Sequence, residues 1–245
     1  MTTPSFISDL TLDTSLAGPM PHQRAPLPLT LAHCHFDSDL YSDNAFCHCG
    51  IALPPRLMRA VIKRRSEFLA GRVCAQRALA QLDIQGTVGS IEGRRDPLWP
   101  PGATGAITHS NGIAAALAGP THHWLSIGLD IEHWIATDSA HTLFSAILQP
   151  DELSLLPAPS DRVLVAQRLT LIFSAKETLF KALNPATGTS FYFHDASTLD
   201  ITANTLTLRL DRSLNRAWPA GTHLICHYRV FSRYVMTWLA IPSRL

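Results

Sequence analysis

The chain has 245 residues, enough for one large domain or two domains of ordinary size. Apolar residues make up 46% of it and charged residues 16%, which is typical of a globular protein with a sizeable core. The formal net charge is +1, which excludes a global attraction to nucleic acid or to an anionic membrane surface.

The charge is nevertheless uneven along the chain. Between residues 56 and 95, nine basic side chains accompany only three acidic ones, a local excess of +6. Such a cluster in a nearly neutral protein favours a compact anionic ligand over a long polyanion, so nucleic acid is not an expected partner. The basic residues are Arg56, Arg59, Lys63, Arg64, Arg65, Arg72, Arg77, Arg94 and Arg95.

The cysteines and the N-terminus indicate in which cellular compartment the protein is expected. Five cysteines without a framework spacing argue against a disulfide scaffold. The N-terminus lacks the pattern of a signal peptide, and no apolar run is long enough to span a membrane. We expect a cytoplasmic protein with reduced thiols.

The first half of the chain predicts a strand, a long helix and a hairpin. Residues 1–30 are Pro-rich and predict an irregular lead-in to a strand over 29–36. Cys and His are dense between residues 34 and 49, but their spacing does not match common zinc motifs, so partly buried loop residues are favoured. Pro54-Pro55 is predicted to open a helix that runs to about Asp83.

A turn-rich loop over 89–105 precedes two strands around Ser110-Asn111-Gly112, a hairpin signal. A strand over 123–132 follows and ends at Asp130 and Glu132.

The second half predicts two helices followed by strands. Helices are expected over 138–156 and 161–184, the second ending at Asn184-Pro185. Three segments in which apolar and polar residues alternate are predicted to be strands: residues 205–210, 223–230 and 234–241. Each half thus has a long helix and several strands. We expect an α+β fold with two similar subdomains, 1–123 and 124–245, and a site between the halves.

Three carboxylates suggest a metal site. Asp130 and Glu132 are two residues apart on one strand, so their side chains share a face. Their repulsion costs roughly 4 kcal/mol at ~4 Å and an effective dielectric constant of about 20. Glu177, on the later helix, would complete an oxygen-rich site of the kind that Mg²⁺ prefers. The alternative for Asp130 and Glu132 is an exposed strand end.

Charged pairs on the two helices have functional and structural interpretations. Glu177 and Lys181 are neighbours at i and i+4, either as a proton-handling pair or as a surface ion pair. Arg64 and Arg72 lie about 80° apart around the helix axis and ~12 Å apart along it, so they could hold two phosphates or form a solvated face. Thr108 and His109 follow a strand and could donate hydrogen bonds to phosphate.

Five motifs, taken together and in order, resemble the 4′-phosphopantetheinyl transferases. They are "RRSEFLAGRVCA", "GRRDPLWP", "ITHS", "GLDIE" and "FSAKETLFKAL". The resemblance covers about residues 54–192 and is to the two-subdomain type, within it to the branch of enterobactin synthetase component D. It implies an α+β fold of two pseudo-symmetric subdomains, each a small, mostly antiparallel sheet packed on a long helix.

The family transfers the 4′-phosphopantetheine arm of coenzyme A to a serine of an apo carrier protein and releases adenosine 3′,5′-bisphosphate. The resemblance implies that Asp130, Glu132 and Glu177 bind Mg²⁺, with Mn²⁺ as an alternative ion. We expect Glu177 to be the catalytic base and Lys181 to stabilise or protonate the leaving phosphate. The implied coenzyme A-binding residues are Arg64, Arg72, Arg94, Arg95, Asp96, Pro97, Thr108, His109, Asp130, Glu177 and Lys181. Arg94 stands where the family often has Lys, which keeps the charge.

Several alternatives remain open at the level of the sequence. A metal-dependent phosphohydrolase acting on coenzyme A or a nucleotide would use the same acids and the same basic cluster. A non-catalytic coenzyme A- or carrier-binding module would not need the acids. The carrier, and therefore the pathway (fatty acid, polyketide, nonribosomal peptide or siderophore), is not readable from these motifs. Because one chain would supply the whole site, we expect a monomer.

Overall fold

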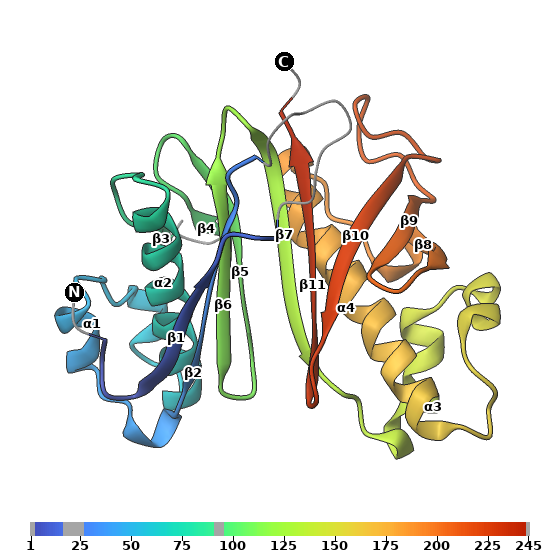
Figure 1. Cartoon of the computed structure of the whole chain (residues 1–245), viewed down its shortest axis with the longest axis horizontal. Helices are drawn as coiled ribbons and strands as arrows, with labels where there is room; N and C mark the ends of the chain where they lie inside the picture. Colours follow the sequence, from blue (N-terminus) through green and yellow to red (C-terminus); the bar gives the residue numbers. More distant parts are fainter. Residues whose placement is uncertain (1–2, 17–26, 91–95, 244–245) are drawn as a thin grey trace. The chain divides into compact units, whose positions relative to one another are not determined.

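The structure is a computed structural model that describes residues 3–16, 27–90 and 96–243 (Figure 1). Contacts divide the chain into two units, which are described separately below. The first unit comprises residues 1–127 and 241–245, and the second comprises residues 128–240. The division into subdomains 1–123 and 124–245 stays a prediction.

The first unit is built on a four-stranded antiparallel sheet. Its strand order is β1-β2-β6-β5. The strands are β1 (Ile7–Asp13), β2 (Thr30–Phe36), β5 (Ala103–Ser110) and β6 (Ile113–Pro120). Asn111 and Gly112, at φ 39° and 81°, connect β5 to β6. Two residues of positive φ are what a tight hairpin turn requires, so the predicted hairpin is confirmed.

Helix α2 (Ile62–Gln81) packs on β2 and β6 of this sheet (Figure 1). Strand β6 contributes Ala114, Ala116 and Ala118 to the core that it shares with α2, all fully buried. Alternate residues of a strand share a face, and these small side chains let the helix come close to the sheet. Leu69, Val73 and Leu79 of α2 fill the core from the other side.

The structure corrects four sequence expectations in the first unit. The long helix begins at Ile62, and Pro54-Pro55 instead open a 3-10 turn, η2 (Pro55–Leu57). The lead-in contains β1, and the turn-rich loop contains a short hairpin of β3 (Gly89–Ser90) with β4 (Pro97–Leu98). Residues 34–49 are not loop: they include the end of β2, the 3-10 turn η1 (Ser38–Leu40) and helix α1 (Asn44–His48).

The second unit contains most of a five-stranded sheet of order β7-β11-β10-β9-β8. The strands are β7 (Trp124–His133), β8 (Ala196–Ile201), β9 (Thr205–Leu210), β10 (His223–Val230) and β11 (Tyr234–Pro242). The four strands predicted over 123–132, 205–210, 223–230 and 234–241 are therefore confirmed. Strand β8 is additional, with only its first three residues buried.

The helices of this unit differ from expectation at their ends. The helix predicted over 138–156 is α3 (Thr137–Ile147), followed by the 3-10 helix η3 (Pro150–Leu155). Helix α4 (Arg162–Thr187) continues past Pro185 and ends at Gly188, whose φ is +65°. A proline is tolerated here because only the last turn loses a hydrogen bond, and the left-handed glycine terminates the helix.

Helix α4 packs closely on β7 at Gly128. A Cβ atom at Gly128 would lie 2.1 Å from the backbone oxygen of Thr178, so only glycine fits at this position. The mixture of helices and antiparallel sheets confirms the predicted α+β class. Within the described part of the chain, no helix is long and apolar enough to cross a membrane.

Candidate functional site

Asp130 is the central carboxylate of the second unit. It projects from β7 and is 2% exposed, so it is not on a wet strand end. Its Oδ1 accepts a hydrogen bond from Lys181 Nζ at 2.6 Å, and its Oδ2 accepts one from Ser174 Oγ at 2.8 Å. Both partners lie on α4, which therefore fixes the orientation of the carboxylate.

Glu132 and Glu177 lie near Asp130 and share its electrostatic environment. Burial, and after it the negative charge of Asp130, raises the pKa of Glu132 to about 7, against the opposing effect of Lys181. Burial also raises the pKa of Glu177, where Lys181 opposes and Asp130 reinforces the shift. The structure thus brings the three predicted acids and Lys181 into one cluster, called the acidic site below.

The chemistry of the acidic site fits a hard divalent cation. Three carboxylates lie near a single ammonium, and the pKa values of Glu132 and Glu177 are raised first by burial and also by the charge of Asp130, so both carboxylates are poorly solvated. In the described residues, no three His, Cys, Asp or Glu side chains are grouped as the ligands of one metal ion. Binding of a metal by Asp130, Glu132 and Glu177 therefore stays a prediction.

An aromatic pocket adjoins the acidic site. It has a volume of about 300 Å³, and Glu177 is one of its lining residues. Phe180 of α4 packs against Phe191 with ring centroids 5.3 Å apart. The pocket, called the arm pocket below, is lined by Lys176, Glu177, Phe180, Ser190, Phe191, Tyr192, Phe193 and Ala196. A mostly apolar pocket with few polar groups is typical of small-molecule binding sites.

In the first unit, Arg64 and His109 are in contact, although they are 45 residues apart. Arg64 Nη1 lies 2.7 Å from His109 Nε2. Because a guanidinium can only donate, Nε2 accepts, and the ring proton is then on Nδ1. His109 Nδ1 faces Glu67 Oε2 at 3.6 Å, and Arg64 Nη1 lies 3.5 Å from the same oxygen. The neighbouring Thr108 is 3% exposed.

Arg72 is the buried cation of α2. It is 5% exposed, its guanidinium stacks 4.6 Å from the ring centroid of Phe68, and Nη2 donates to Gly89 O at 2.9 Å. Burial, followed by the charge of Arg56, lowers its pKa to about 10. Its Nε is buried without a hydrogen-bond partner among the described residues. A buried cation with an unsatisfied donor is suited to an anionic ligand.

A pocket of about 380 Å³ lies beside Arg72, whose partner Gly89 is in its wall. Arg56 and Phe68 line it together with residues 50–55 and 87–90. The predicted residue Pro97 pairs with Ser90 of the wall through the β3–β4 hairpin, and Asp96 directly precedes this strand. The predicted residues Arg94 and Arg95 lie outside the described residues. We call Arg64, Arg72, Thr108 and His109, with this pocket, the basic site.

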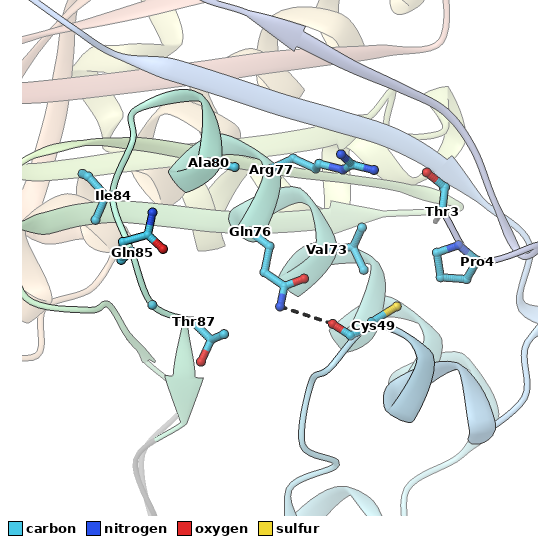
Figure 2. A pocket seen from close by; sticks show the side chains of 11 residues that line it. Thr3, Pro4, Cys49, Val73, Gln76, Arg77, Ala80, Ile84, Gln85 and Thr87 are labelled. Carbon is cyan, nitrogen blue, oxygen red and sulfur yellow. Dashed lines mark hydrogen bonds between the residues drawn. The ribbon is translucent and has the colours of Figure 1, made fainter. Parts of the chain in front are cut away.

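A third pocket, of about 320 Å³, is lined by Cys49 and by Thr87, which also lines the pocket beside Arg72 (Figure 2). Gln76 and Arg77 of α2 line it, and Gln76 donates a hydrogen bond to Cys49 O at 3.4 Å. None of the predicted site residues lines this pocket. We therefore place the candidate chemistry at the acidic and basic sites.

Three residues of the second unit were not predicted as functional. Ser174 orients Asp130, and Lys176 forms a buried ion pair with Glu152. Ser174 and Lys176 lie within "FSAKETLFKAL", three residues and one residue before Glu177, so the motif contained the signal. Glu152 has no such signal because its partner is 24 residues away.

Comparison with known proteins defines the class. The family model described as "4′-phosphopantetheinyl transferase N-terminal domain" matches residues 54–119. The one described as "4′-phosphopantetheinyl transferase superfamily" matches residues 126–239. The first range contains Arg64, Arg72 and His109, and the second contains the whole acidic site. The chain belongs to the 4′-phosphopantetheinyl transferase superfamily.

Individual relatives agree with this class. Enterobactin synthase component D of Salmonella typhimurium is 34% identical over 195 residues, which are 76% of this chain and 76% of the relative. The 4′-phosphopantetheinyl transferase PptT of Mycobacterium tuberculosis is 32% identical over 171 residues, 69% of this chain and 73% of the relative. The 4′-phosphopantetheinyl transferase Svp of Streptomyces mobaraensis is 36% identical over 164 residues, 62% and 61% of the two chains.

Proposed function

We propose that the protein transfers the 4′-phosphopantetheine arm of coenzyme A to a serine of an apo acyl or peptidyl carrier protein. The second product is adenosine 3′,5′-bisphosphate. The observation that carries the proposal is the acidic site: three carboxylates and one lysine gathered on β7 and α4, next to an aromatic pocket. Membership of the family supports the same reaction. The comparisons give no support to the phosphohydrolase alternative.

Asp130, Glu132 and Glu177 would hold Mg²⁺, or Mn²⁺ in its place. When bound, the cation would neutralise negative charge on the pyrophosphate of coenzyme A. The electrostatics support this role, because burial, and after it the negative charge of Asp130, raises the pKa of Glu132 to about 7, and a cation would offset both effects. Ser174 holds one oxygen of Asp130 through its hydroxyl and so keeps the carboxylate oriented.

Glu177 is the proposed general base for the carrier serine. A serine hydroxyl is a weak nucleophile until a base takes its proton, and a carboxylate with a raised pKa is a better base than a free one. Lys181 is the proposed stabiliser of the leaving phosphate. Its side chain is 28% exposed, so it can contact both Asp130 and a ligand.

The basic site would bind the phosphates and the nucleotide of coenzyme A. Arg72 offers a buried positive charge and an unsatisfied Nε donor. Arg64 and His109 offer a second set of donors, and Thr108 lies next to them in β5. Arg94, Arg95, Asp96 and Pro97 are proposed to complete this binding.

The arm pocket would receive the pantetheine arm. The arm is largely apolar with two amide groups, and the pocket combines aromatic rings with a few polar side chains. Glu177 lines the pocket, so the proposed base lies at one end of the proposed arm position.

The identity of the carrier protein, the oligomeric state and the cellular location are also proposals. The name of the Salmonella typhimurium relative suggests a carrier of siderophore assembly, while fatty-acid and polyketide carriers remain candidates. We propose a monomeric enzyme of the cytoplasm.

The test uses the intact protein with coenzyme A, Mg²⁺ and a panel of apo carrier proteins. Intact-mass spectrometry should show an increase equal to one 4′-phosphopantetheine group on at least one carrier. The added group should disappear when the acceptor serine of that carrier is replaced by alanine. Unchanged masses across fatty-acid, polyketide and peptide carriers would refute the proposed function.

A further inference from the structure

Lys176 and Glu152 form a buried ion pair in the second unit. Lys176 Nζ lies 2.6 Å from Glu152 Oε2, and the two side chains are 2% and 1% exposed. Charged side chains are almost never buried to this extent unless they are paired. Neither ion reaches solvent, so neither is placed to take part in the chemistry directly.

Every hydrogen-bonding position of the lysine is used. Besides Glu152, Lys176 Nζ donates to Ile147 O at 2.8 Å and to Phe193 O at 3.1 Å. An ammonium has three donors, so this set is complete. Glu152 in turn accepts from Gln149 N at Oε2 and from Thr198 N at Oε1, at 2.8 and 2.7 Å.

The two side chains therefore tie five segments together. Lys176 on α4 holds the end of α3 through Ile147 and the 3-10 helix η4 (Phe193–Asp195) through Phe193. Glu152 on η3 holds the start of its own helix and strand β8. Among the described residues, η4 is also held by Gln149 Nε2, which donates to His194 O at 2.6 Å, and by Asp211 N, which donates to Asp195 O at 2.9 Å. The hydrogen bond from Lys176 Nζ to Phe193 O is the one that ties η4 directly to α4 next to the pocket.

That connection is one wall of the arm pocket. Phe191, Tyr192 and Phe193 come from it, whereas Lys176, Glu177 and Phe180 come from α4. The carbonyl of Phe193 is a direct acceptor of Lys176, and the ring of Phe193 packs against Phe173 of α4 at 5.4 Å. The ion pair thus holds the two walls of the pocket at a fixed separation.

We propose that Lys176 and Glu152 are a positioning pair that sets the shape of the arm pocket and, through it, the affinity for the pantetheine arm. The proposal rests on the proposed function, because it assumes that the arm occupies this pocket. Polar contacts of fixed direction specify a geometry that an apolar pair of similar volume would not, even where the apolar pair is equally stable. The pair acts through the pocket walls and is not catalytic.

The test compares two ligands that differ in the arm. Coenzyme A has the arm, and adenosine 3′,5′-bisphosphate lacks it. In Lys176→Met, calorimetry should show binding of coenzyme A weakened about tenfold, since small displacements of positioning groups cost about this much or more. Binding of adenosine 3′,5′-bisphosphate should stay within about twofold of the unsubstituted protein.

A second variant separates positioning from folding. Lys176→Met leaves the Glu152 carboxylate buried and unpaired, so this variant should melt at a lower temperature or fail to fold. Lys176→Met combined with Glu152→Gln removes both charges and should recover part of the lost melting temperature. Phe193 O and Ile147 O still lack their donor, so binding of coenzyme A should remain weak in the double variant.

Two matched controls complete the design. Arg162→Met removes an ion pair between α4 and α3 that is exposed, and it should change neither ligand's affinity. Leu206→Ala destabilises the core of β9 away from the pocket, so it should lower the melting temperature without separating the two ligands.

Equal weakening of both ligands in the double variant, or recovery of coenzyme A binding together with stability, would overturn the positioning role. If the unsubstituted protein binds adenosine 3′,5′-bisphosphate and coenzyme A with equal affinity, the arm has no pocket and the proposal also fails. Neither result touches transfer to the carrier, which the mass shift tests. Absence of that shift would refute the proposed function itself.

Discussion

The two long helices use their buried cations in different ways. On α2 the buried Arg72 contacts neutral groups, the ring of Phe68 and Gly89 O, while the more exposed Arg64 contacts both His109 and Glu67. On α4 the cations are paired with acids, Lys181 with Asp130 and Lys176 with Glu152. Excess positive charge therefore remains in the first unit, while the second unit gathers carboxylates. One helix is suited to hold an anion and the other to hold a cation.

The largest effect on transfer activity should come from removing the metal, on which the acidic site is proposed to depend. Treatment with EDTA should abolish transfer, since the three carboxylates would face the pyrophosphate without a cation. Added Mg²⁺ should restore activity, as measured by the mass of the carrier. Full activity in the presence of excess EDTA would remove the metal from the account.

Glu177→Gln should separate chemistry from binding. The amide keeps the size of the side chain but cannot accept the serine proton, so kcat should fall by about 10²-fold or more. Binding of coenzyme A should stay within about threefold, because the basic site is unchanged. Glu132→Gln is the informative comparison. Both variants lose a proposed metal ligand, but a high Mg²⁺ concentration should restore most of the activity of Glu132→Gln and only a small part of that of Glu177→Gln, which also lacks the base. Turnover at the original rate would exclude Glu177 as the base.

Arg72→Lys tests the other helix. Lysine keeps the positive charge but loses the planar stacking on Phe68 and the fork of donors that reaches Gly89 O. The KM for coenzyme A should rise about tenfold while kcat stays within about twofold, which is the sign of lost ground-state and transition-state binding alike. A fall in kcat at unchanged KM would contradict the assignment of Arg72 to binding. Arg162→Met, remote from both sites, serves as the control.

The smallest effects on activity should come from two glycines at the helix–sheet contacts, which affect the stability of the fold instead. A Cβ at Gly128 would meet the backbone oxygen of Thr178 at 2.1 Å, whereas one at Gly71 would meet a side-chain methyl of Ile107 at 2.6 Å. Backbone cannot move aside as a side chain can, so Gly128→Ala should cost about 3 kcal/mol of unfolding free energy. Gly71→Ala should cost no more than about 1 kcal/mol, because alanine favours the helix. Urea denaturation measures both, and an equal loss would contradict the difference in packing.

The sequence predicted the elements whose apolar pattern is strong and missed those whose pattern is weak. Strands β9, β10 and β11 alternate buried and exposed residues or are mostly buried. Strand β1 has only its first residue buried, so it carried no apolar pattern. Helix α4 extends beyond Pro185 because a proline in the last turn removes only a terminal backbone hydrogen bond.

The site residues could be predicted by type and spacing, but not their contacts. Asp130 and Lys181 are 51 residues apart, and Arg64 and His109 are 45 apart, so pairing depends on tertiary packing that no local pattern contains. The i, i+4 spacing of Glu177 and Lys181 suggested one pair, and the structure adds the contact of Lys181 with Asp130. The arm pocket depends on three aromatic residues that follow α4, which had no motif of their own.

The most direct test of the central claim measures both products together. Coenzyme A, Mg²⁺ and an apo carrier that accepts the arm are incubated with the protein, and adenosine 3′,5′-bisphosphate and modified carrier are quantified in the same samples. A transferase predicts equal amounts of the two products at every time point, and no bisphosphate when the carrier is omitted. Release of bisphosphate without carrier, at the same rate as with it, would contradict the account and identify a hydrolase.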